Sequence, residues 1–317
     1  MYLCKKMYRM NFIRISFTRL FCLLLIFASC KEKGILPKPI IEEKSWKEEI
    51  TEYEKLLDKD PSFNNFQIGM LKISQMLVDT SFESAKKDIL LKGIQWCRKY
   101  KNQSYSLVFM KEYAKAFPVD SNTESFLMTL VDSYNEDTKE LEVKILYDGI
   151  LKRWPDAKSA RENWNRIKRD PDEFDFFLGT TGEKMFGTKE KFVIDSARVE
   201  QFLSLSESYA LAYPDDPRTE RILMTAAQTA QTAGNGARAI EFFDWVWRYF
   251  PDSEEAPLAL FLKGFVYETN LNNKELAMES YKLFIKKYPR HPRNKEAEFL
   301  LENIHTPDNE LIEKLEN

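Results

Sequence analysis

The chain has 317 residues, of which 44% are apolar and 14% aromatic, so it can form a packed core, and wholesale disorder is excluded. Only 10 glycines and 13 prolines interrupt it, which favours helix. The net charge of −3 is unevenly distributed: residues 1–29 carry five basic residues and no acid, which leaves 47 − 5 = 42 basic against 50 acidic residues, or −8, in the remainder. An acidic body of this kind argues against nucleic acid as the partner.

The N-terminal segment 1–29 has the pattern of an export signal. Its basic residues are followed by a nine-residue apolar run, Leu20–Ala28, far short of the roughly 20 residues that span a bilayer. A charged region, a short apolar region and small residues at the end are typical of a secretory signal peptide. The ending Ile26-Phe27-Ala28-Ser29-Cys30 resembles a bacterial lipobox. The alternative is an ordinary secreted protein with an incidental cysteine.

The lipobox resemblance implies that cleavage occurs before Cys30, which then carries diacylglycerol on its sulfur and a further acyl chain, such as palmitate, on its amino group. Two or three acyl chains would anchor the protein stably, at ~0.8 kcal/mol per buried methylene. Residues 30–45 contain Pro37 and Pro39 and form an extended linker. Cys97 is then the remaining cysteine of the mature chain, so no intramolecular disulfide is available, and its apolar surroundings predict a buried thiol.

Residues 46–169 are predicted to form the N-terminal group of helical repeats. Ser45–Leu57 is amphipathic, and Phe66–Val78 and Ala85–Tyr100 continue the helical pairing. Residues 196–305 form the C-terminal group. Between them, residues 170–195 are a loop insertion, of which Asp170–Thr188 contains three glycines and a phenylalanine cluster. The insertion is either an aromatic patch packed on the repeats or a flap or hinge that contacts a partner. Residues 306–317 are predicted to be a short tail helix.

The repeat itself is marked by aromatic-proline pairs, whose prolines are 37, 59, 37 and 38 residues apart and are Pro118, Pro155, Pro214, Pro251 and Pro289. The long interval therefore holds 59 − 37 = 22 extra residues. Helix-pairing residues recur at fixed distances before each proline. At 21 residues (22 for the last unit) these are Cys97, Tyr134, Val193, Ala230 and Tyr267.

Local signals define the ends of the predicted helices. Ser121–Glu124 has the form of a capping box, and Asp216-Pro217 places an N-cap before a proline. Asn235-Gly236 predicts the tight turn between two helices of one unit.

The last two units resemble tetratricopeptide (TPR) repeats through two series of residues: Gly264, Tyr267, Ala277, Tyr281, Phe284 and Pro289, and Ala227, Ala230, Ala239, Phe243 and Pro251. The resemblance extends unevenly over roughly residues 62–304. It implies an all-α fold, a TPR-like α-solenoid of helix-turn-helix units. It also implies that the first helix of each unit lines a concave face on which peptides bind.

No catalytic centre is indicated. His291 and His305 have no nucleophile or carboxylate arrangement around them, and no metal-ligand spacing occurs, so we expect neither an enzyme nor a cofactor nor a metal. Trp245 and Trp247 cannot both face the same core, so one is a candidate contact residue.

Candidate protein-binding residues are those predicted to lie off the pairing face defined by Val131, Ala227 and Gly264. They are Met128, Asp132 and Asn135, then Met224, Gln228 and Gln231, and then Phe261, Phe265 and Glu268.

Together these features predict a lipid-anchored scaffold for protein-protein interactions in the bacterial cell envelope. It would be held on the outer membrane, facing the periplasm, with envelope proteins or peptides as partners. The layout is similar to that of the lipoprotein subunit of the β-barrel assembly machinery and of Tol-Pal-associated TPR proteins, which implies outer-membrane protein assembly or envelope maintenance. The alternative is a glycan-binding or nutrient-binding lipoprotein of an outer-membrane uptake system, for which Phe174–Phe177 would supply aromatics. An envelope hydrolase is a third class.

Overall fold

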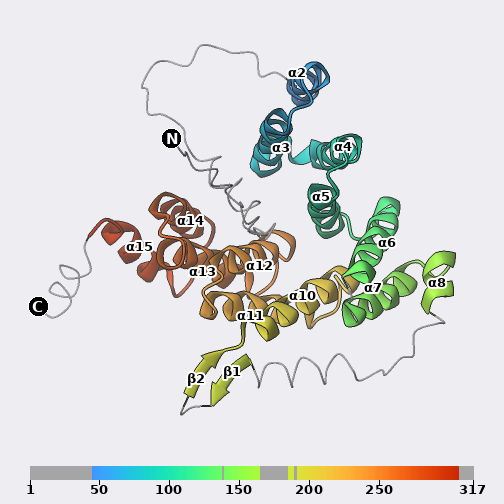
Figure 1. The fold of residues 1–317 in the computed structure, drawn as a ribbon. Helices are drawn as coiled ribbons and strands as arrows, with labels where there is room; N and C mark the ends of the chain where they lie inside the picture. The colour runs from blue at the N-terminus through green and yellow to red at the C-terminus, as the bar shows by residue number, and fades with distance from the viewer. Residues whose placement is uncertain (1–44, 138, 165–184, 189–190, 307–317) are drawn as a thin grey trace, which may run out of the picture.

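A computed structural model describes residues 45–137, 139–164, 185–188 and 191–306. These residues are mainly helical, and within each of the two groups given below every helix packs against the next along the chain (Figure 1). The first group of elements is α2 (Trp46–Lys59), α3 (Phe63–Val78), the 3₁₀ helix η1 (Thr80–Ala85), α4 (Lys86–Lys99), α5 (Gln103–Ala116), α6 (Ser121–Glu136), α7 (Glu140–Arg153) and α8 (Lys158–Trp164). The second group is α10 (Ser196–Ala212), α11 (Thr219–Thr232), α12 (Gly236–Tyr249), α13 (Ala256–Thr269), α14 (Lys274–Lys287) and α15 (Asn294–Asn303).

The consecutive packing of helices agrees with the predicted α-solenoid. One feature departs from an all-α chain. The strands β1 (Phe186–Thr188) and β2 (Lys191–Ile194) pair in an antiparallel two-stranded sheet, which lies within the predicted insertion. Val193 is part of β2, so the prediction that it occupies a helix-pairing position is wrong. A residue can fit the spacing of the repeat and still not lie in a helix.

The five aromatic-proline corners share one backbone geometry. The aromatic residue ends the second helix of its unit with φ between −133° and −125° and ψ between 55° and 78°. A following proline excludes the helical region for this residue, which is why the helix stops there. In each corner the carbonyl of the aromatic residue accepts a hydrogen bond of 3.0–3.2 Å from the amide three residues later. The corner is therefore a repeated structural unit.

Two corners also repeat their side-chain contacts. A tyrosine hydroxyl donates to an aspartate at 2.8 Å in the pairs Tyr113–Asp120 and Tyr209–Asp216. A threonine three residues beyond each aspartate donates its hydroxyl to the aromatic carbonyl at 2.6 Å. The threonine hydroxyls thus add a second donor to carbonyls at the end of a helix, which also accept the backbone amides of the corner.

The aspartates of these two corners affect where the next helix begins. Asp120, and not Ser121, is the N-cap of α6, because its carboxylate accepts the amide of Asn122. The predicted capping box from Ser121 is therefore wrong by one residue. The turn after Asp216 continues to Arg218, so α11 begins at Thr219, later than the predicted N-cap.

The turns inside the helix pairs are also repeated. Four backbone hydrogen bonds of 2.8–2.9 Å close them, and their acceptors are the carbonyls of Cys97, Tyr134, Ala230 and Tyr267. These are four of the five positions that the repeat predicted. In the turn before α12, Gly234 has the left-handed φ of 75°, while Asn235 caps α12 through the amide of Arg238. The predicted turn is present, but its left-handed residue precedes Asn235-Gly236.

Small residues lie where helices cross closely. Ala239 and Ala277 are fully buried, and a Cβ atom at Gly264 would stand 2.7 Å from the ring of Tyr281. At Gly149 a Cβ would approach Ala212 to 2.5 Å, so α7 and α10 pack directly against each other although α8 and the two strands lie between them in sequence. This contact returns the chain after the insertion to the first helical group.

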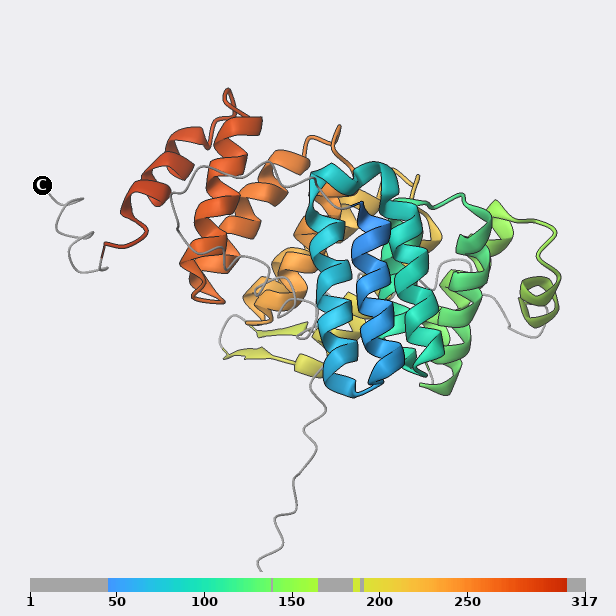
Figure 2. The same ribbon diagram turned by 90° about the horizontal axis from the view of Figure 1, so that it is seen from above.

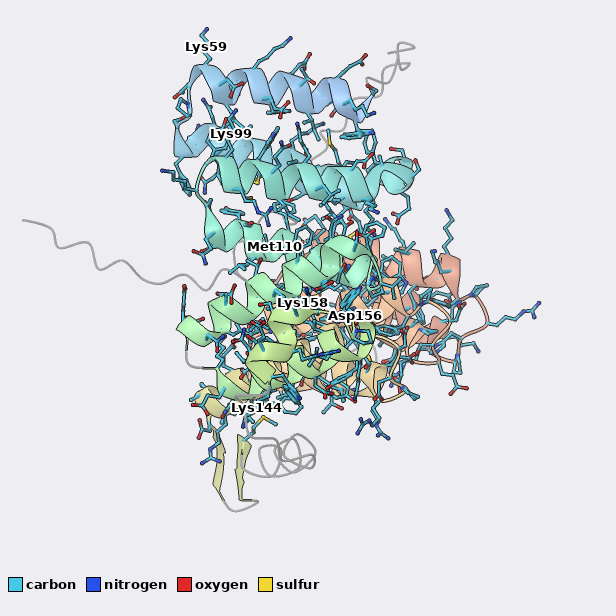
Figure 3. All side chains as sticks on the ribbon, turned by 90° about the vertical axis from the view of Figure 1, so that its right-hand side faces the viewer. Lys59, Lys99, Met110, Lys144, Asp156 and Lys158 are labelled. Atoms are coloured by element: carbon cyan, nitrogen blue, oxygen red, sulfur yellow. The ribbon has the colours of Figure 1, made fainter. Side chains whose placement is uncertain are left out.

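The helices curl so that α10 and α12 both reach α5 (Figure 1). These are second helices of their units. The expectation that first helices line the inner side of the curl is therefore wrong for this region. At the N-terminal end, α2, α3 and α4 run alongside one another (Figure 2). An ion pair between Lys99 and Asp58 joins the ends of α4 and α2, at the edge where Lys59 and Lys99 lie (Figure 3).

Candidate protein-binding surfaces

Some predicted features lie outside the described residues. These are the lipid-acceptor Cys30 with its linker, the Phe174–Phe177 cluster and the tail 307–317. What the sequence predicts for these segments remains a prediction.

The nine candidate contact residues differ in their exposure. Those that are exposed are Asp132, Asn135 and Gln228. Those that are half-buried are Met128, Gln231, Phe265 and Glu268. Those that are buried are Met224 and Phe261.

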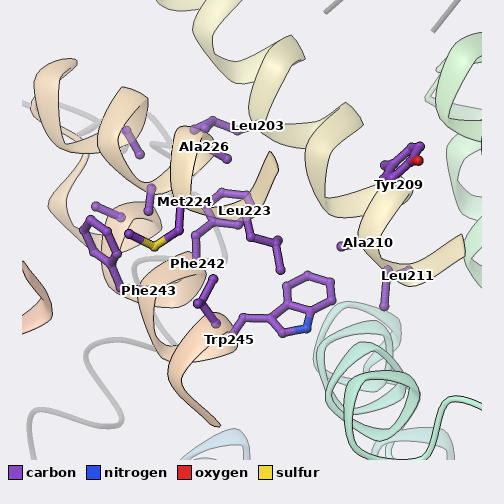
Figure 4. Close-up of a cluster of buried hydrophobic side chains, with 14 of the residues drawn as sticks. Leu203, Tyr209, Ala210, Leu211, Leu223, Met224, Ala226, Phe242, Phe243 and Trp245 are labelled. Atoms are coloured by element: carbon purple, nitrogen blue, oxygen red, sulfur yellow. The ribbon is translucent and has the colours of Figure 1, made fainter. Parts of the chain in front are cut away.

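The prediction that Met224 and Phe261 face a groove is wrong. Phe261 is 2% exposed and packs on α14, with its ring centroid 5.9 Å from that of Tyr281 and 5.5 Å from that of Phe284. Met224 is 4% exposed and lies among buried side chains that include Phe243 (Figure 4). Both residues stand three positions before the pairing residue of their helix, and positions i and i+3 share a helical face.

Two other candidates also share a helical face with a pairing residue, which explains why they contact the rest of the fold. Met128, three residues before Val131, packs partly against the hydrophobic core. Glu268, four residues after Gly264, accepts a hydrogen bond of 2.8 Å from the hydroxyl of Tyr281. Its carboxylate therefore holds its own helix pair together.

Asn135 is exposed four residues after Val131, and three other accessible candidates immediately follow the pairing residue of their first helix. They are Asp132 in α6, Gln228 in α11 and Phe265 in α13. Phe265 is half-buried, yet it is not among the side chains that pack on either core cluster of the described chain. The side chain of Asn270 donates to the carbonyl of Gln231 at 3.3 Å, which joins the units that carry Gln228 and Phe265. Because α7 and α10 stand between α6 and α11, Asp132 lies apart from the other two (Figure 1).

A groove of about 530 Å³ lies between α2 and α4. Its apolar lining is Trp46, Ile50 and Leu91. At one side Glu54 joins the two helices, because it pairs with Lys92 at 2.6 Å and accepts the indole N–H of Trp96 at 2.8 Å. An apolar groove with charged groups at its margin suits a polypeptide segment. The sequence pattern marked α2 and α4 as helices but did not indicate the space between them.

The inner junction of α5, α10 and α12 is ionic. Glu207 of α10 is 7% exposed and pairs with Lys111 of α5 at 2.9 Å and with Arg238 of α12 at 3.5 Å. Arg238, 5% exposed, also pairs with Glu241 at 2.7 Å. Tyr249 donates to Glu112 of α5 at 3.5 Å. These charges come from distant parts of the sequence, so no local pattern could have predicted their meeting.

The charges at this junction depend on one another. Burial raises the pKa of the Glu207 carboxyl, but Lys111 and Arg238 more than offset this effect, and the pKa lies well below its ordinary value. Burial likewise acts on Asp244, yet Arg248 at 2.7 Å and Lys263 lower its pKa to about 2. Both carboxylates are therefore ionised at neutral pH. The Lys111–Glu207 pair joins the two helical groups, and the Lys263–Asp244 pair joins α12 to α13.

The two tryptophans of α12 lie in different surroundings. Trp245 is buried, and it extends toward the end of α10 near Ala210 and Leu211 (Figure 4). Trp247 is half-buried, with the ammonium groups of Lys263 and Lys287 at 5.6 and 6.0 Å from its ring centroid. The expectation that one of the two packs in the core is confirmed for Trp245.

The Cys97 thiol is fully buried, as predicted, with its sulfur 3.7 Å from the sulfur of Met70. Burial raises its pKa to about 12, so it is a poor nucleophile. His291 accepts the amide of Arg293 at its Nδ1 and packs edge-on against Phe284. Within the described ranges, His, Cys, Asp and Glu side chains form no group of three or more that could hold a metal ion. None of the helices placed by the structure has the length and apolar character needed to span a bilayer.

Comparison with known proteins does not add to this description: no model of a protein family matches the chain, and no curated protein is significantly similar to it.

Proposed function

We propose that this protein is a lipid-anchored, TPR-like scaffold that binds other proteins in the bacterial cell envelope. The observation that carries the proposal is the repetition of one corner geometry at five aromatic-proline pairs and of one turn geometry in four helix pairs, with prolines 37–38 residues apart except for one interval of 59. Helix pairs stacked in this way form extended surfaces with which repeat proteins bind partners. Its role would be outer-membrane protein assembly or envelope maintenance. This agrees with the similarity of its predicted layout to the lipoprotein subunit of the β-barrel assembly machinery and to Tol-Pal-associated TPR proteins.

The outer faces of the first helices are the proposed binding surfaces. The second helices α5, α10 and α12 contact one another and form ion pairs. Their inward faces are therefore not free for a partner. Gln228, Phe265 and the groove between α2 and α4 remain accessible. They combine apolar anchors with polar groups, as protein interfaces do.

Phe265 offers the sharpest test of this surface. Lipidated wild-type protein, Phe265→Ala and the matched surface control Lys282→Ala are used to capture partners from crosslinked envelopes of the native host. A phenylalanine at the centre of an interface can contribute 2 kcal/mol or more, on the order of thirtyfold in affinity. We expect Phe265→Ala to lose capture of a protein that the wild type and Lys282→Ala retain, at an unchanged melting temperature. Capture that is equal for all three proteins would contradict this surface.

The lipid anchor is tested separately. Because Cys30 is the only proposed acyl acceptor, Cys30→Ser should block processing or release the protein from membranes into the soluble fraction. Fractionation and intact-mass measurement check both outcomes. If Cys30→Ser is cleaved and membrane-bound like the wild type, the anchor is elsewhere.

A further inference from the structure

A cavity of about 330 Å³ lies where three second helices end. The C-terminal ends of α5, α10 and α12 meet there, with their aromatic-proline corners. Three prolines and three aromatic residues contribute to its walls: Pro118, Pro214, Pro217, Trp245, Tyr249 and Phe250. Its volume is at the lower end of the range for small-ligand pockets and is sufficient for one long side chain.

The electrostatics of this cavity favour a cation. Three carboxylates, Asp215, Asp216 and Glu220, line it together with one ammonium group, that of Lys115, so the lining carries a net charge of 1 − 3 = −2. Each of the three helix C-termini adds roughly half a negative charge. The aromatic walls add a further attraction, because the faces of aromatic rings attract cations.

Some of these charges are already neutralised and some are not. Asp216 pairs with Arg218 at 3.1 Å, and Lys115 pairs with Glu112 at 2.7 Å while its ammonium lies 4.5 Å from the Trp245 ring centroid. Asp215 is exposed and is attracted by the charge of Arg153 without a direct ion pair to it, and Glu220 accepts the hydroxyl of Ser253 and has no ion pair within the described chain. Two carboxylates are thus available to an incoming cation.

The protein itself places an arginine next to this cavity. The guanidinium of Arg153 donates to the carbonyls of Pro118 and Leu211, each at 2.8 Å, and so joins the ends of α5 and α10. Burial lowers the pKa of Arg153 to about 10, yet the group remains protonated at neutral pH. These two carbonyls are occupied by Arg153, so an incoming cation would bind the carboxylates of the cavity instead.

We propose that this cavity is a subsite for the basic side chain of a partner polypeptide, an arginine or a lysine. The cation lies between the carboxylates of Asp215 and Glu220, with its aliphatic part against the prolines and Tyr249. The inference builds on the proposed protein-binding function and assigns one chemical feature to the partner. Because the cavity is formed by the ends of second helices, it is distinct from the surface around Phe265.

Purified full-length protein tests this inference without any envelope partner. The probes are two capped pentapeptides that differ at one position, Ac-Gly-Ser-Arg-Ser-Gly-NH₂ and its analogue with citrulline, the uncharged isostere of arginine. A third peptide carries lysine. Binding is followed by titration with saturation-transfer NMR on the side-chain protons. We expect wild-type protein to bind the arginine peptide at least tenfold more tightly than the citrulline peptide, with lysine closer to arginine.

The matched variants are Asp215→Asn with Glu220→Gln in one chain, and Asp252→Asn in another. Asp252 follows Pro251 as Asp215 follows Pro214, and it is exposed but does not line the cavity. The double variant should lose the preference for arginine over citrulline, and Asp252→Asn should retain it. Equal binding of the two peptides, no binding, or an equal loss in both variants would each overturn the subsite. Since no envelope protein is involved, failure here leaves the capture experiment on Phe265 as an independent test of the proposed function.

Discussion

Glu207 lies at the junction of the two helical groups. It is nearly buried and stands between Lys111 and Arg238, which come from different helices. A buried ion pair adds little relative to an apolar pair, but removal of one partner leaves the other charges buried and uncompensated.

Glu207→Gln should therefore lower the free energy of unfolding by about 3–5 kcal/mol at neutral pH. Denaturant unfolding measures this value, and Glu298→Gln, an exposed residue of α15, is the control. A loss below about 0.5 kcal/mol, as for ordinary surface substitutions, would show that the network does not stabilise the fold.

The effect of Glu207→Gln should also depend on pH. The folded pKa of Glu207 lies below its ordinary value of 4.5, so the stabilisation is fully present above about pH 4.5 and is lost as the pH falls toward the folded pKa. The difference in stability between wild type and Glu207→Gln should be constant from pH 6 to pH 8 and shrink below about pH 4.5. If the stability difference between wild type and Glu207→Gln grows on acidification, the pKa of Glu207 is raised in the folded protein and not lowered.

For single residues, burial could be predicted from the sequence in some cases, but the contact residues were partly assigned to the wrong helical face. Burial of Cys97 could be predicted from its apolar neighbours, and it is confirmed. Phe261 and Met224 were misassigned because both stand three residues before a pairing residue and share its face. The residue directly after the pairing position, such as Phe265, is the one left accessible. Side-chain size and polarity alone did not distinguish these positions.

At the scale of elements, the corner after each second helix was the most predictable feature. The residue before proline cannot be helical, so five aromatic-proline pairs define five helix ends. The helix beginnings were less predictable. Asp120, not Ser121, caps α6, because the tyrosine-aspartate contact of the corner fixes the position of that carboxylate.

Close packing within one helix pair is tested by Ala277→Leu. Ala277 has no exposed surface, and its neighbour helix carries Gly264 at the crossing. A larger side chain should overpack this contact and lower stability by about 1–3 kcal/mol. Thermal unfolding measures the loss, and Lys282→Leu, an exposed change on the same helix, is the control. Equal melting temperatures for Ala277→Leu and wild type would mean that α13 and α14 do not cross at this residue.

At the scale of the molecule, the consecutive packing of helices could be predicted, but the direction of the curl could not. The repeat pattern records which helices are neighbours in sequence. It contains no information on the meeting of α5 with α10 and α12, which depends on the contact between Gly149 and Ala212 after the insertion. For the same reason the cavity beside Tyr249 and the network around Glu207 were not predicted.

We hold that the inward faces of the second helices close against one another and leave the outer faces of the first helices for partners. The contact between Glu112 of α5 and Tyr249 of α12 tests it most directly. A Glu112→Cys, Tyr249→Cys chain is prepared with Cys4, Cys22 and Cys30 replaced by Ser. The buried Cys97 does not compete for reagent, because its pKa is raised to about 12. As a control, Glu112→Cys is combined with Lys282→Cys.

Both proteins are treated with a short bifunctional thiol reagent, and linked peptides are identified by mass spectrometry. We expect an intramolecular link between positions 112 and 249 in the monomer and none between 112 and 282. Absence of the 112–249 link, in a protein whose two cysteines each react with a monofunctional reagent, would contradict the closed arrangement and return the second helices to the set of possible binding surfaces.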